Sequence, residues 1–301
     1  MSKQFRLGLI GFGEAGFNIA KGLKSAGLTD IFAYDIHTHS PQLGQRIQER
    51  AKESETTLVD SSSELARASD VLLSTVTADQ DRNAANQTAP FLESRHIYAD
   101  LNSVSPAMKQ SIEKIITSCG ARFVEAAVMA PVPPYGHRVP MLLAGGAAAE
   151  FAELMRPYGM QLEVISEDVG AAAATKMFRS IVVKGLEALM LECVLGASQY
   201  GADERVLASL AESFPGIDWK RLANYMIGRV VVHGERRARE MEEVADTLRA
   251  IGIEPIMATA TAQRQDWCAR LGLSSRFGAE GPQDYRDVLE AIATLTSHNP
   301  I

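Results

Sequence analysis

Short β-rich apolar runs alternate with amphipathic helical patterns through the first half of the chain. Such alternation is typical of a parallel β-sheet with helices packed on its faces. From the runs we expect strands at residues 6–10, 31–34, 57–59, 71–75, 96–100, 122–126, 139–144 and 162–165. From the patterns between them we expect helices at 16–26, 41–52, 61–68, 80–90, 106–119 and 147–158.

The alternation stops after Ile165, and the second half of the chain shows helical patterns only. Glycine-containing turns separate these patterns, one of them at Gly234, and glycine is a common helix stop. We expect helices at 168–198, 203–214, 219–232, 235–251, 255–271 and 283–297. The predicted fold class is therefore α/β, with a Rossmann-type parallel-sheet domain over 1–168. A long inter-domain helix and an all-α domain follow over 169–301.

Composition narrows the class of protein. The chain has 301 residues, of which 46% are hydrophobic, and a formal net charge of −7, which does not suit a nucleic-acid-binding surface. No apolar run approaches the roughly 20 residues of a membrane-spanning helix, and the first residues show no signal-peptide pattern. The three cysteines lack metal-ligand spacing. We expect a soluble, cytoplasmic protein with a small-molecule substrate and no metal, nucleic acid or membrane partner.

A glycine-rich loop follows the first expected strand and opens the first expected helix. Gly11 would allow the tight turn, Gly13 the approach of a pyrophosphate, and Gly16 the close packing of helix on sheet. Free backbone N–H groups and the positive end of the helix dipole would hold the phosphates. The expected cofactor-binding residues of this loop are Gly11, Phe12, Gly13, Glu14, Ala15 and Gly16.

The second expected strand ends at Asp35, about 20 residues after the loop. A carboxylate at this position can accept hydrogen bonds from both ribose hydroxyls of NAD and would repel the 2′-phosphate of NADP. His37 and His39, just beyond Asp35, argue instead for NADP, because they could accommodate its 2′-phosphate. We expect NAD as the cofactor and leave NADP open. Val76, Thr77 and Ser103 complete the expected cofactor-binding residues.

The chain resembles the β-hydroxyacid dehydrogenase superfamily, whose members include 3-hydroxyisobutyrate and 6-phosphogluconate dehydrogenases. The resemblance is good from Leu7 to about Lys184 and fades afterwards, where the chain is similar to the helical domain of poorly characterised phosphogluconate dehydrogenase relatives. It is carried by the Gly11–Gly16 loop, by Asp100-Leu101-Asn102-Ser103-Val104-Ser105-Pro106 and by Gly170-Ala171-Ala172-Ala173-Ala174-Thr175-Lys176.

In that family, the segment after the fifth strand contacts substrate and the nicotinamide ribose. The resemblance places Asn102 and Ser103 at those positions, and we expect both to bind substrate. Independently of the family, open α/β sheets bind ligands at the carboxyl ends of their strands. A helix that begins at Pro106 and is capped by Ser105 accounts for the same segment, and both interpretations can hold together.

A second family segment, Asp-Ala-Pro-Val-Ser-Gly-Gly, is replaced here by Glu125-Ala126-Ala127-Val128-Met129-Ala130-Pro131. Without the paired glycines, the backbone cannot approach a small carboxylate as it does in the relatives. Met129 and a proline-rich loop stand in their place. We therefore expect a substrate other than 3-hydroxyisobutyrate, with a more apolar or bulkier group near the reacting carbon.

The resemblance implies that Lys176 is the catalytic lysine. Oxidation of an alcohol needs a group that takes the hydroxyl proton. A lysine amine, with a pKa of about 10.4 in water, can do so when burial or a neighbouring cation lowers that value. Ser180 and Lys184 share its helix face and are expected to contact substrate, and Lys184 would alternatively act on the charge of Lys176.

Departures from the family pattern on this helix bear on the reaction. The family usually has Asn where this chain has Ser180, and 6-phosphogluconate dehydrogenases have Glu where it has Val183. The missing Glu argues against the decarboxylating mechanism. The helix is apolar almost all round, so we expect little of it to be in water.

In the helical domain, His233 and Arg237 lie four residues apart. His233 is an expected substrate-binding residue that could anchor a carboxylate with Arg236 or Arg237. An exposed helix face with Glu/Arg pairs is the alternative interpretation. The resemblance implies that this domain also packs in a homodimer.

We therefore expect an NAD(P)-dependent oxidoreductase that acts on the CH–OH group of a small β-hydroxy acid or related alcohol, with Lys176 as general acid/base. One alternative is imine reduction, which family members without the lysine perform. The other is a non-catalytic dinucleotide-sensing protein, and the altered 125–131 segment favours it.

Overall fold

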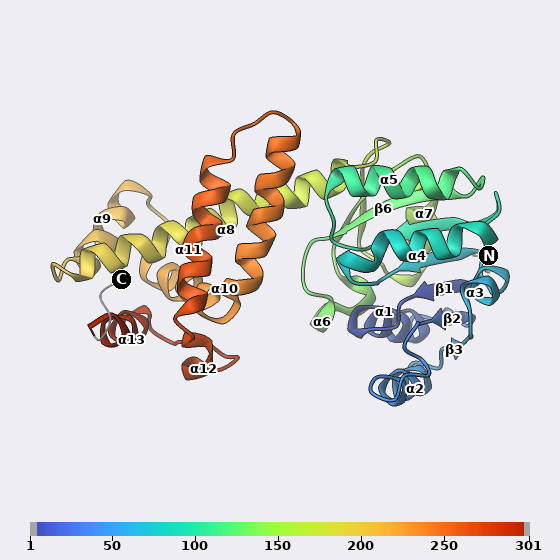
Figure 1. The fold of residues 1–301 in the computed structure, drawn as a ribbon, viewed down its shortest axis with the longest axis horizontal. Coiled ribbons are helices and arrows are strands. Elements are labelled where there is room, and N and C mark those ends of the chain that lie inside the picture. The colour runs from blue at the N-terminus through green and yellow to red at the C-terminus, as the bar shows by residue number, and fades with distance from the viewer. Residues whose placement is uncertain (1–4, 298–301) are drawn as a thin grey trace. The chain divides into compact units, whose positions relative to one another are not determined.

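A single sheet of eight strands dominates the first half of the chain in this computed structural model, which describes residues 5–297 (Figure 1). The strand order is β3-β2-β1-β4-β5-β6-β7-β8, and each strand lies within two residues of its predicted bounds. The strands are β1 (Leu7–Ile10), β2 (Ile31–Tyr34), β3 (Thr57–Leu58), β4 (Val71–Ser74), β5 (Ile97–Asp100), β6 (Arg122–Val128), β7 (Met141–Ala144) and β8 (Leu162–Ser166).

Neighbouring strands are parallel except for β6 and β7, which are antiparallel, so the predicted parallel sheet is confirmed with one antiparallel pair that the sequence did not indicate. The connection between them contains no helix longer than one turn. A parallel pair needs a long crossover, whereas an antiparallel pair can be joined by a short link. Here only α6 (Val132–Tyr135) and the 3-10 turn η3 (Gly136–Arg138) lie between the two strands.

Helices cover both faces of the sheet (Figure 1). Because of this, β1, β4 and β5 are buried along their whole length, as continuous apolar strands of parallel sheets are. One face packs against α1 (Glu14–Ser25), α2 (Gly44–Glu53) and α7 (Ala148–Met155), and the other against α3 (Ser62–Ala68), α4 (Asp81–Thr88) and α5 (Pro106–Thr117). The 3-10 turns η1 (Ala78–Gln80), η2 (Ala89–Phe91) and η4 (Arg156–Tyr158) complete this part.

The chain divides into two compact units between Lys176 and Met177, inside the helix α8 (Ala171–Ser198). The second unit is helical and has its own apolar cores. Besides the rest of α8 it contains α9 (Asp203–Ser213), α10 (Trp219–Ala250), α11 (Ile256–Arg270), α12 (Leu273–Phe277) and α13 (Tyr285–Ser297).

The predicted break at Gly234 is wrong, because α10 runs through it as one helix. A Cβ atom at this position would lie 3.0 Å from the carbonyl oxygen of Gln265 and 3.3 Å from Cβ of Ala269. Both belong to α11, so the glycine lets two helices approach closely and does not end either of them.

The apolar surface of α8 is more exposed than we expected. In the described chain Val182, Leu186 and Leu189 are 62%, 42% and 53% exposed and form a stripe on one side of the helix. No helix within residues 5–297 is long and apolar enough to cross a membrane.

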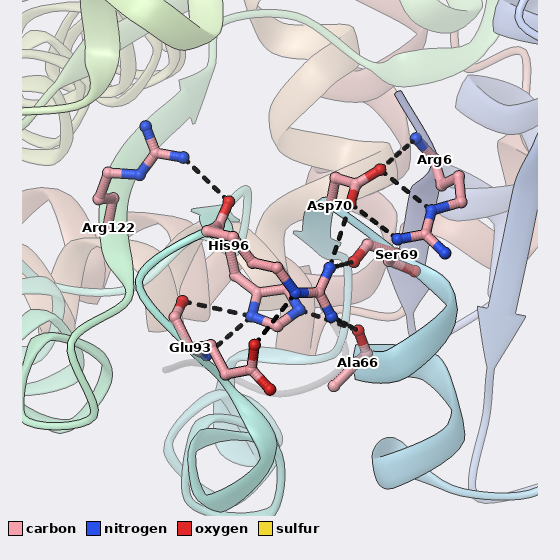
Figure 2. A network of polar contacts seen from close by, with 8 residues as sticks. Arg6, Ala66, Ser69, Asp70, Glu93, His96 and Arg122 are labelled. Atoms are coloured by element: carbon pink, nitrogen blue, oxygen red, sulfur yellow. Dashed lines mark hydrogen bonds and ion pairs between the residues drawn. The ribbon is translucent and has the colours of Figure 1, made fainter. Parts of the chain in front are cut away.

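The amino ends of β1, β4 and β5 are joined by a network of polar contacts (Figure 2). Asp70 accepts hydrogen bonds from the backbone N–H, Nε and Nη2 of Arg6 at 2.8–3.1 Å and from Nη1 of Arg95 at 3.1 Å. The buried ring of His96 donates from Nε2 to the carbonyl oxygen of Ala66 and accepts the N–H of Glu93 at Nδ1. The hydrogen bonds from Arg6 lower the pKa of Asp70 to about 2.

The carboxyl ends of β4 and β5 enclose a second polar cluster, which is almost completely buried. Nδ2 of Asn102 donates to Oγ of Ser74 at 2.8 Å and to Oδ1 of Asp81 at 2.7 Å. Nζ of Lys109 donates to the carbonyl oxygen of Asp100 at 2.9 Å and lies 3.0 Å from Oδ2 of its carboxylate. Burial and the charge of Asp100 raise the pKa of Asp81 to about 7.

The amino-end network predicts an acid-dependent loss of stability. Replacing Asp70 by Asn should lower the unfolding free energy at pH 7 by about 1 kcal/mol, a modest value because these side chains are partly in water. The folded-state pKa of Asp70 is lowered, so its contribution is present above about pH 4 and disappears as the pH falls towards 2. The melting temperatures of wild type and Asp70→Asn should therefore converge between pH 7 and pH 2.5 in circular dichroism scans. An equal difference at all pH values would contradict this prediction.

The carboxyl-end cluster predicts the opposite pH dependence. Because the folded-state pKa of Asp81 is raised, the folded chain binds the extra proton, and stability falls as the pH rises from about 4 to about 7. Asp81→Asn mimics the protonated side chain and should be more stable than wild type at pH 8, by on the order of 1–3 kcal/mol. Melting temperatures at pH 5 and pH 8 test this. Asp81→Ala is the control, since it removes the acceptor of Asn102 and should be less stable at both pH values. An unchanged pH slope in Asp81→Asn would refute the prediction.

Candidate functional site

The loop between β1 and α1 has the backbone geometry that its glycines predict. Gly11 has φ +82°, and a Cβ there would lie 2.8 Å from Cγ1 of Val76. A Cβ at Gly16 would lie 2.7 Å from the carbonyl oxygen of Gly11 and from Oγ1 of Thr75. At Gly13 nothing lies within 4 Å of that position, so the loop backbone faces open space there.

Asp35 lies at the end of β2 and is tied to this loop. Its Oδ2 accepts the N–H of Phe12 at 2.7 Å, and its Oδ1 accepts the N–H of His37 at 2.9 Å. Each carboxylate oxygen has a second lone pair that a ribose hydroxyl can use. The Asp35 side chain is therefore positioned by the backbone and keeps acceptor capacity for a ligand.

A cavity of about 380 Å³ lies beside Asp35. Among the residues predicted to bind a cofactor, Gly11, Phe12, Gly13, Asp35, Val76 and Thr77 line it. Arg46 and Arg50 from α2 line it as well, and the sequence analysis missed both. They belong to a polar helix face with no motif of its own, so only the fold brings them to the cavity.

Thr75 was also missed. It follows β4, and its Oγ1 donates to the carbonyl oxygen of Gly11 at 2.8 Å. This contact joins the glycine loop to the neighbouring strand. Thr75 directly precedes Val76 and Thr77, which were predicted to bind the cofactor, and this position could have indicated it.

A second cavity, of about 310 Å³, contains the predicted lysine. Nζ of Lys176 donates to Oγ of Ser103 at 2.6 Å, and both residues line the cavity with Ala15, Val76 and Asn102. The amide nitrogen of Asn102 is bonded to Ser74 and Asp81, so this side chain fastens the segment before Ser103 to the sheet. Every one of these residues belongs to the first unit.

The segment that departs from the family pattern forms an apolar wall of the same cavity. Val128, Ala130 and Val132 line it. Met129 instead packs against an alanine cluster that includes Ala127. The apolar character expected at this point is present, and it comes from the neighbours of Met129.

Glu125 in that segment has a role that the sequence analysis did not foresee. The residue is completely buried on β6. Its Oε2 accepts the N–H of Gly170 and its Oε1 accepts the N–H of Ala173, both at 2.6 Å. These groups belong to the start of α8, so a strand carboxylate caps the helix that carries Lys176.

The other predicted substrate residues, Ser180, Lys184 and His233, belong to the second unit and do not line the two cavities. Lys184 is buried, and its Nζ lies 2.6 Å from Oε2 of Glu240. Burial lowers the pKa of Lys184, and the hydrogen bond to Glu240 opposes this shift. Burial and the charge of Arg229 lower the pKa of His233.

Arg237 is not an exposed partner for His233. It is buried, and its Nη1 lies 3.0 Å from the buried carboxylate of Glu187 on α8. The interpretation in which Arg237 and His233 together anchor a substrate carboxylate finds no support in this arrangement.

The first unit fits a dinucleotide. Open space at Gly13 leaves room for a pyrophosphate at the start of α1, where helix N–H groups favour an anion. The cavity beside Asp35 is large enough for part of a nucleoside. The cavity with Lys176 adjoins it through Thr75 and Val76, which line both.

Comparison with known proteins agrees with this geometry. Residues 6–160 match the family described as the NAD binding domain of 6-phosphogluconate dehydrogenase, and residues 197–268 match a domain of unknown function, DUF1932. The mitochondrial 3-hydroxyisobutyrate dehydrogenase of Drosophila melanogaster is 26% identical over 221 residues, which are 71% of this chain and 64% of that protein.

Two solved structures are similar over most of their length. A conserved hypothetical protein from Sinorhizobium meliloti 1021 is 35% identical, with a TM-score of 0.87 over 98% of this chain and 97% of that one. MTH1747, a conserved protein of unknown function described as structurally similar to 3-hydroxyacid dehydrogenases, is 30% identical, with a TM-score of 0.76 over 88% of this chain and 97% of that one. The resemblance found in the sequence is thus confirmed, and the chain belongs to the β-hydroxyacid dehydrogenase superfamily, with a first unit that is an NAD(P)-binding domain of the 6-phosphogluconate dehydrogenase type.

Proposed function

We propose that this protein is an NAD(P)-dependent dehydrogenase that acts on the CH–OH group of a small β-hydroxy acid or related alcohol. The observation that carries the proposal is the 2.6 Å contact between Nζ of Lys176 and Oγ of Ser103, in a cavity that adjoins the dinucleotide loop. An amine and a hydroxyl side by side can bind the oxygen of an alcohol and handle its proton.

A nicotinamide dinucleotide held by the Gly11–Gly16 loop and Asp35 would supply the hydride acceptor in the oxidising direction and the hydride donor in the reducing direction. The neutral amine of Lys176 takes the hydroxyl proton as the carbon–oxygen double bond forms, and gives it back in the reverse reaction. The hydroxyl of Ser103 can accept a hydrogen bond from Lys176 while donating one to the substrate oxygen. Ser103 therefore orients both the lysine and the substrate.

The cavity wall supports a substrate with an apolar substituent. Val128, Ala130 and Val132 offer no polar side-chain atom, so a hydrocarbon group against them would gain from leaving water. A substrate larger or more apolar than 3-hydroxyisobutyrate suits this wall better than a second polar group does.

For the cofactor we propose NAD in preference to NADP, on the basis of Asp35. Its carboxylate is fixed by two backbone N–H groups and would lie against the ribose that carries the 2′-phosphate in NADP. Arg46 and Arg50 oppose this preference, because they bring positive charge to the same cavity.

Of the alternatives, imine reduction is disfavoured by the placement of Lys176 in the cavity. A dinucleotide sensor would keep cofactor binding without turnover, so measured turnover separates it from the dehydrogenase.

The homodimer stays a prediction. We propose that a second copy packs on the exposed stripe formed by Val182, Leu186 and Leu189.

The cofactor proposal is tested by titrating NADH and NADPH into wild type and Asp35→Ala, with nicotinamide fluorescence as the readout. We expect wild type to prefer NADH and the variant to lose about 10-fold or more of its NADH affinity, because hydrogen bonds to a charged group are lost. NADPH affinity should fall less, so the ratio of the two is decisive. Asp60→Ala, which removes an exposed carboxylate outside the cavity, is the matched control. A wild type that binds neither cofactor below millimolar concentration would overturn the proposal.

The role of Lys176 is tested with a panel of β-hydroxy acids that differ in their side chain. We expect the Lys176→Ala variant to lose about 10²–10⁴-fold in kcat, the range for removal of a general acid/base, with NADH affinity unchanged within about 2-fold. Lys114→Ala removes an exposed lysine of α5 and should behave as wild type. Retained turnover in Lys176→Ala would exclude the lysine from its proposed role.

A further inference from the structure

Glu125 lies far from Lys176 in sequence but is bonded to the beginning of its helix. Both carboxylate oxygens accept backbone N–H groups, from Gly170 and Ala173, at 2.6 Å. The side chain is fully buried, where a carboxylate without donors would cost several kcal/mol. These two hydrogen bonds are therefore a strong constraint on where α8 begins.

The local backbone is shaped for this contact. The first N–H groups of a helix have no intrahelical acceptor and need one from elsewhere. Gly170 has φ +108° and no side chain that could cap the helix. A Cβ there would lie 3.2 Å from Nε2 of Gln110 and 3.3 Å from Cβ of Pro106, so the position is too close for a larger residue. Glu125 thus supplies from the sheet an acceptor that Gly170 itself cannot offer.

Strand β5, which pairs with β6, holds the segment that carries Ser103, the partner of Lys176. Asp100 and Glu125 are direct register partners on β5 and β6. Oδ1 of Asp100 accepts the N–H of Asn102, the residue before Ser103. One carboxylate therefore holds the serine segment and its neighbour holds the lysine helix.

We propose that Glu125 is a positioning residue, which sets the Lys176–Ser103 contact by fixing the first turn of α8 against β6. Lys176 follows Ala173 by three residues, so a shift of the first turn moves the lysine with it. The proposal rests on the proposed role of Lys176, and it assigns to Glu125 an effect on a group that it does not touch.

The central variant is Glu125→Gln, which keeps the shape of the side chain. Its amide oxygen can accept one N–H, while its NH₂ group faces the other donor, so the cap is half lost. Hydrogen exchange of the peptide around 168–178 reports the cap itself. It should become at least about 10-fold faster for the first turn, because the amides of Gly170 and Ala173 lose protection.

The deciding measurement is an NMR titration of the Lys176 side chain. Biosynthetic labelling with ¹³Cε-lysine gives an NMR signal for each lysine, and the signal absent in Lys176→Arg is that of Lys176. In Glu125→Gln we expect its titration midpoint to move by at least about half a pH unit, because loss of the Ser103 partner changes the energy of its charged form. With the substrate found by the screen, kcat should fall about 10–100-fold and NADH affinity should stay within about 2-fold.

Asp70→Asn is the control, since it weakens contacts at the opposite end of the strands. It should leave the Lys176 titration and kcat as in wild type. If Glu125→Gln shows the faster exchange but an unchanged Lys176 titration and kcat, the positioning role is wrong. If Glu125→Gln does not fold, Ala173→Pro replaces it, because it deletes one donor within the first turn, where proline is tolerated.

Failure of the proposed function gives a different result. If Lys176→Ala keeps its turnover, the lysine is not the acid/base, yet a moved titration in Glu125→Gln still establishes that Glu125 positions it. The NMR titration of Lys176 needs no substrate, so it tests the positioning role of Glu125 independently of the proposed activity.

Discussion

Carboxylates buried at the carboxyl ends of neighbouring strands are the constraint on which the site depends. Asp100 and Glu125 are fully buried and lie side by side on β5 and β6. A buried carboxylate must find hydrogen-bond donors, and those found here are largely backbone N–H groups and one buried ammonium group. Because the backbone donors belong to the segments that carry Ser103 and Lys176, satisfying the carboxylates also places the proposed catalytic pair.

Two helix starts at this edge of the sheet use their free N–H groups differently. At α8 the carboxylate of Glu125 occupies them. At α1 the N-cap is Gly13, which makes no side-chain cap hydrogen bond within the described chain and has open space where a Cβ would be. An anion is favoured at either start by the same partial charge. The protein fills one with its own side chain, and the other is where we propose that the cofactor pyrophosphate binds, even though the chain has a net charge of −7.

The parts of this structure that follow from local pattern could be predicted from the sequence, and those that depend on distant partners could not. The strands and the glycine loop depend on periodicity and on short-range backbone geometry, and each lies where the pattern puts it. Gly234 shows the limit, because the same residue suits a helix stop and a close helix contact, and only the presence of α11 decides between them. The cap by Glu125 spans 45 and 48 residues of sequence and leaves no local signal. The raised pKa of Asp81 likewise arises from burial in the folded chain and from the charge of Asp100, which lies on another element of the sheet domain.

The two lysines of α8 show why a shared helix face does not imply a shared role. Lys176 and Lys184 lie eight residues apart, close to two turns, so the helical spacing alone does not distinguish them, and only the family resemblance points to Lys176. Lys184 is buried against the carboxylate of Glu240 at 2.6 Å, and such a pair is stable only while both charges remain. A proton carrier must pass between charged and neutral forms, which would break that pair in every turnover. Lys176 is partly exposed, lines a cavity and contacts a hydroxyl, a partner that accepts from the charged amine and can donate to the neutral one. The nature of the partner, more than the position on the helix, therefore favours Lys176 over Lys184 for the proposed proton transfer.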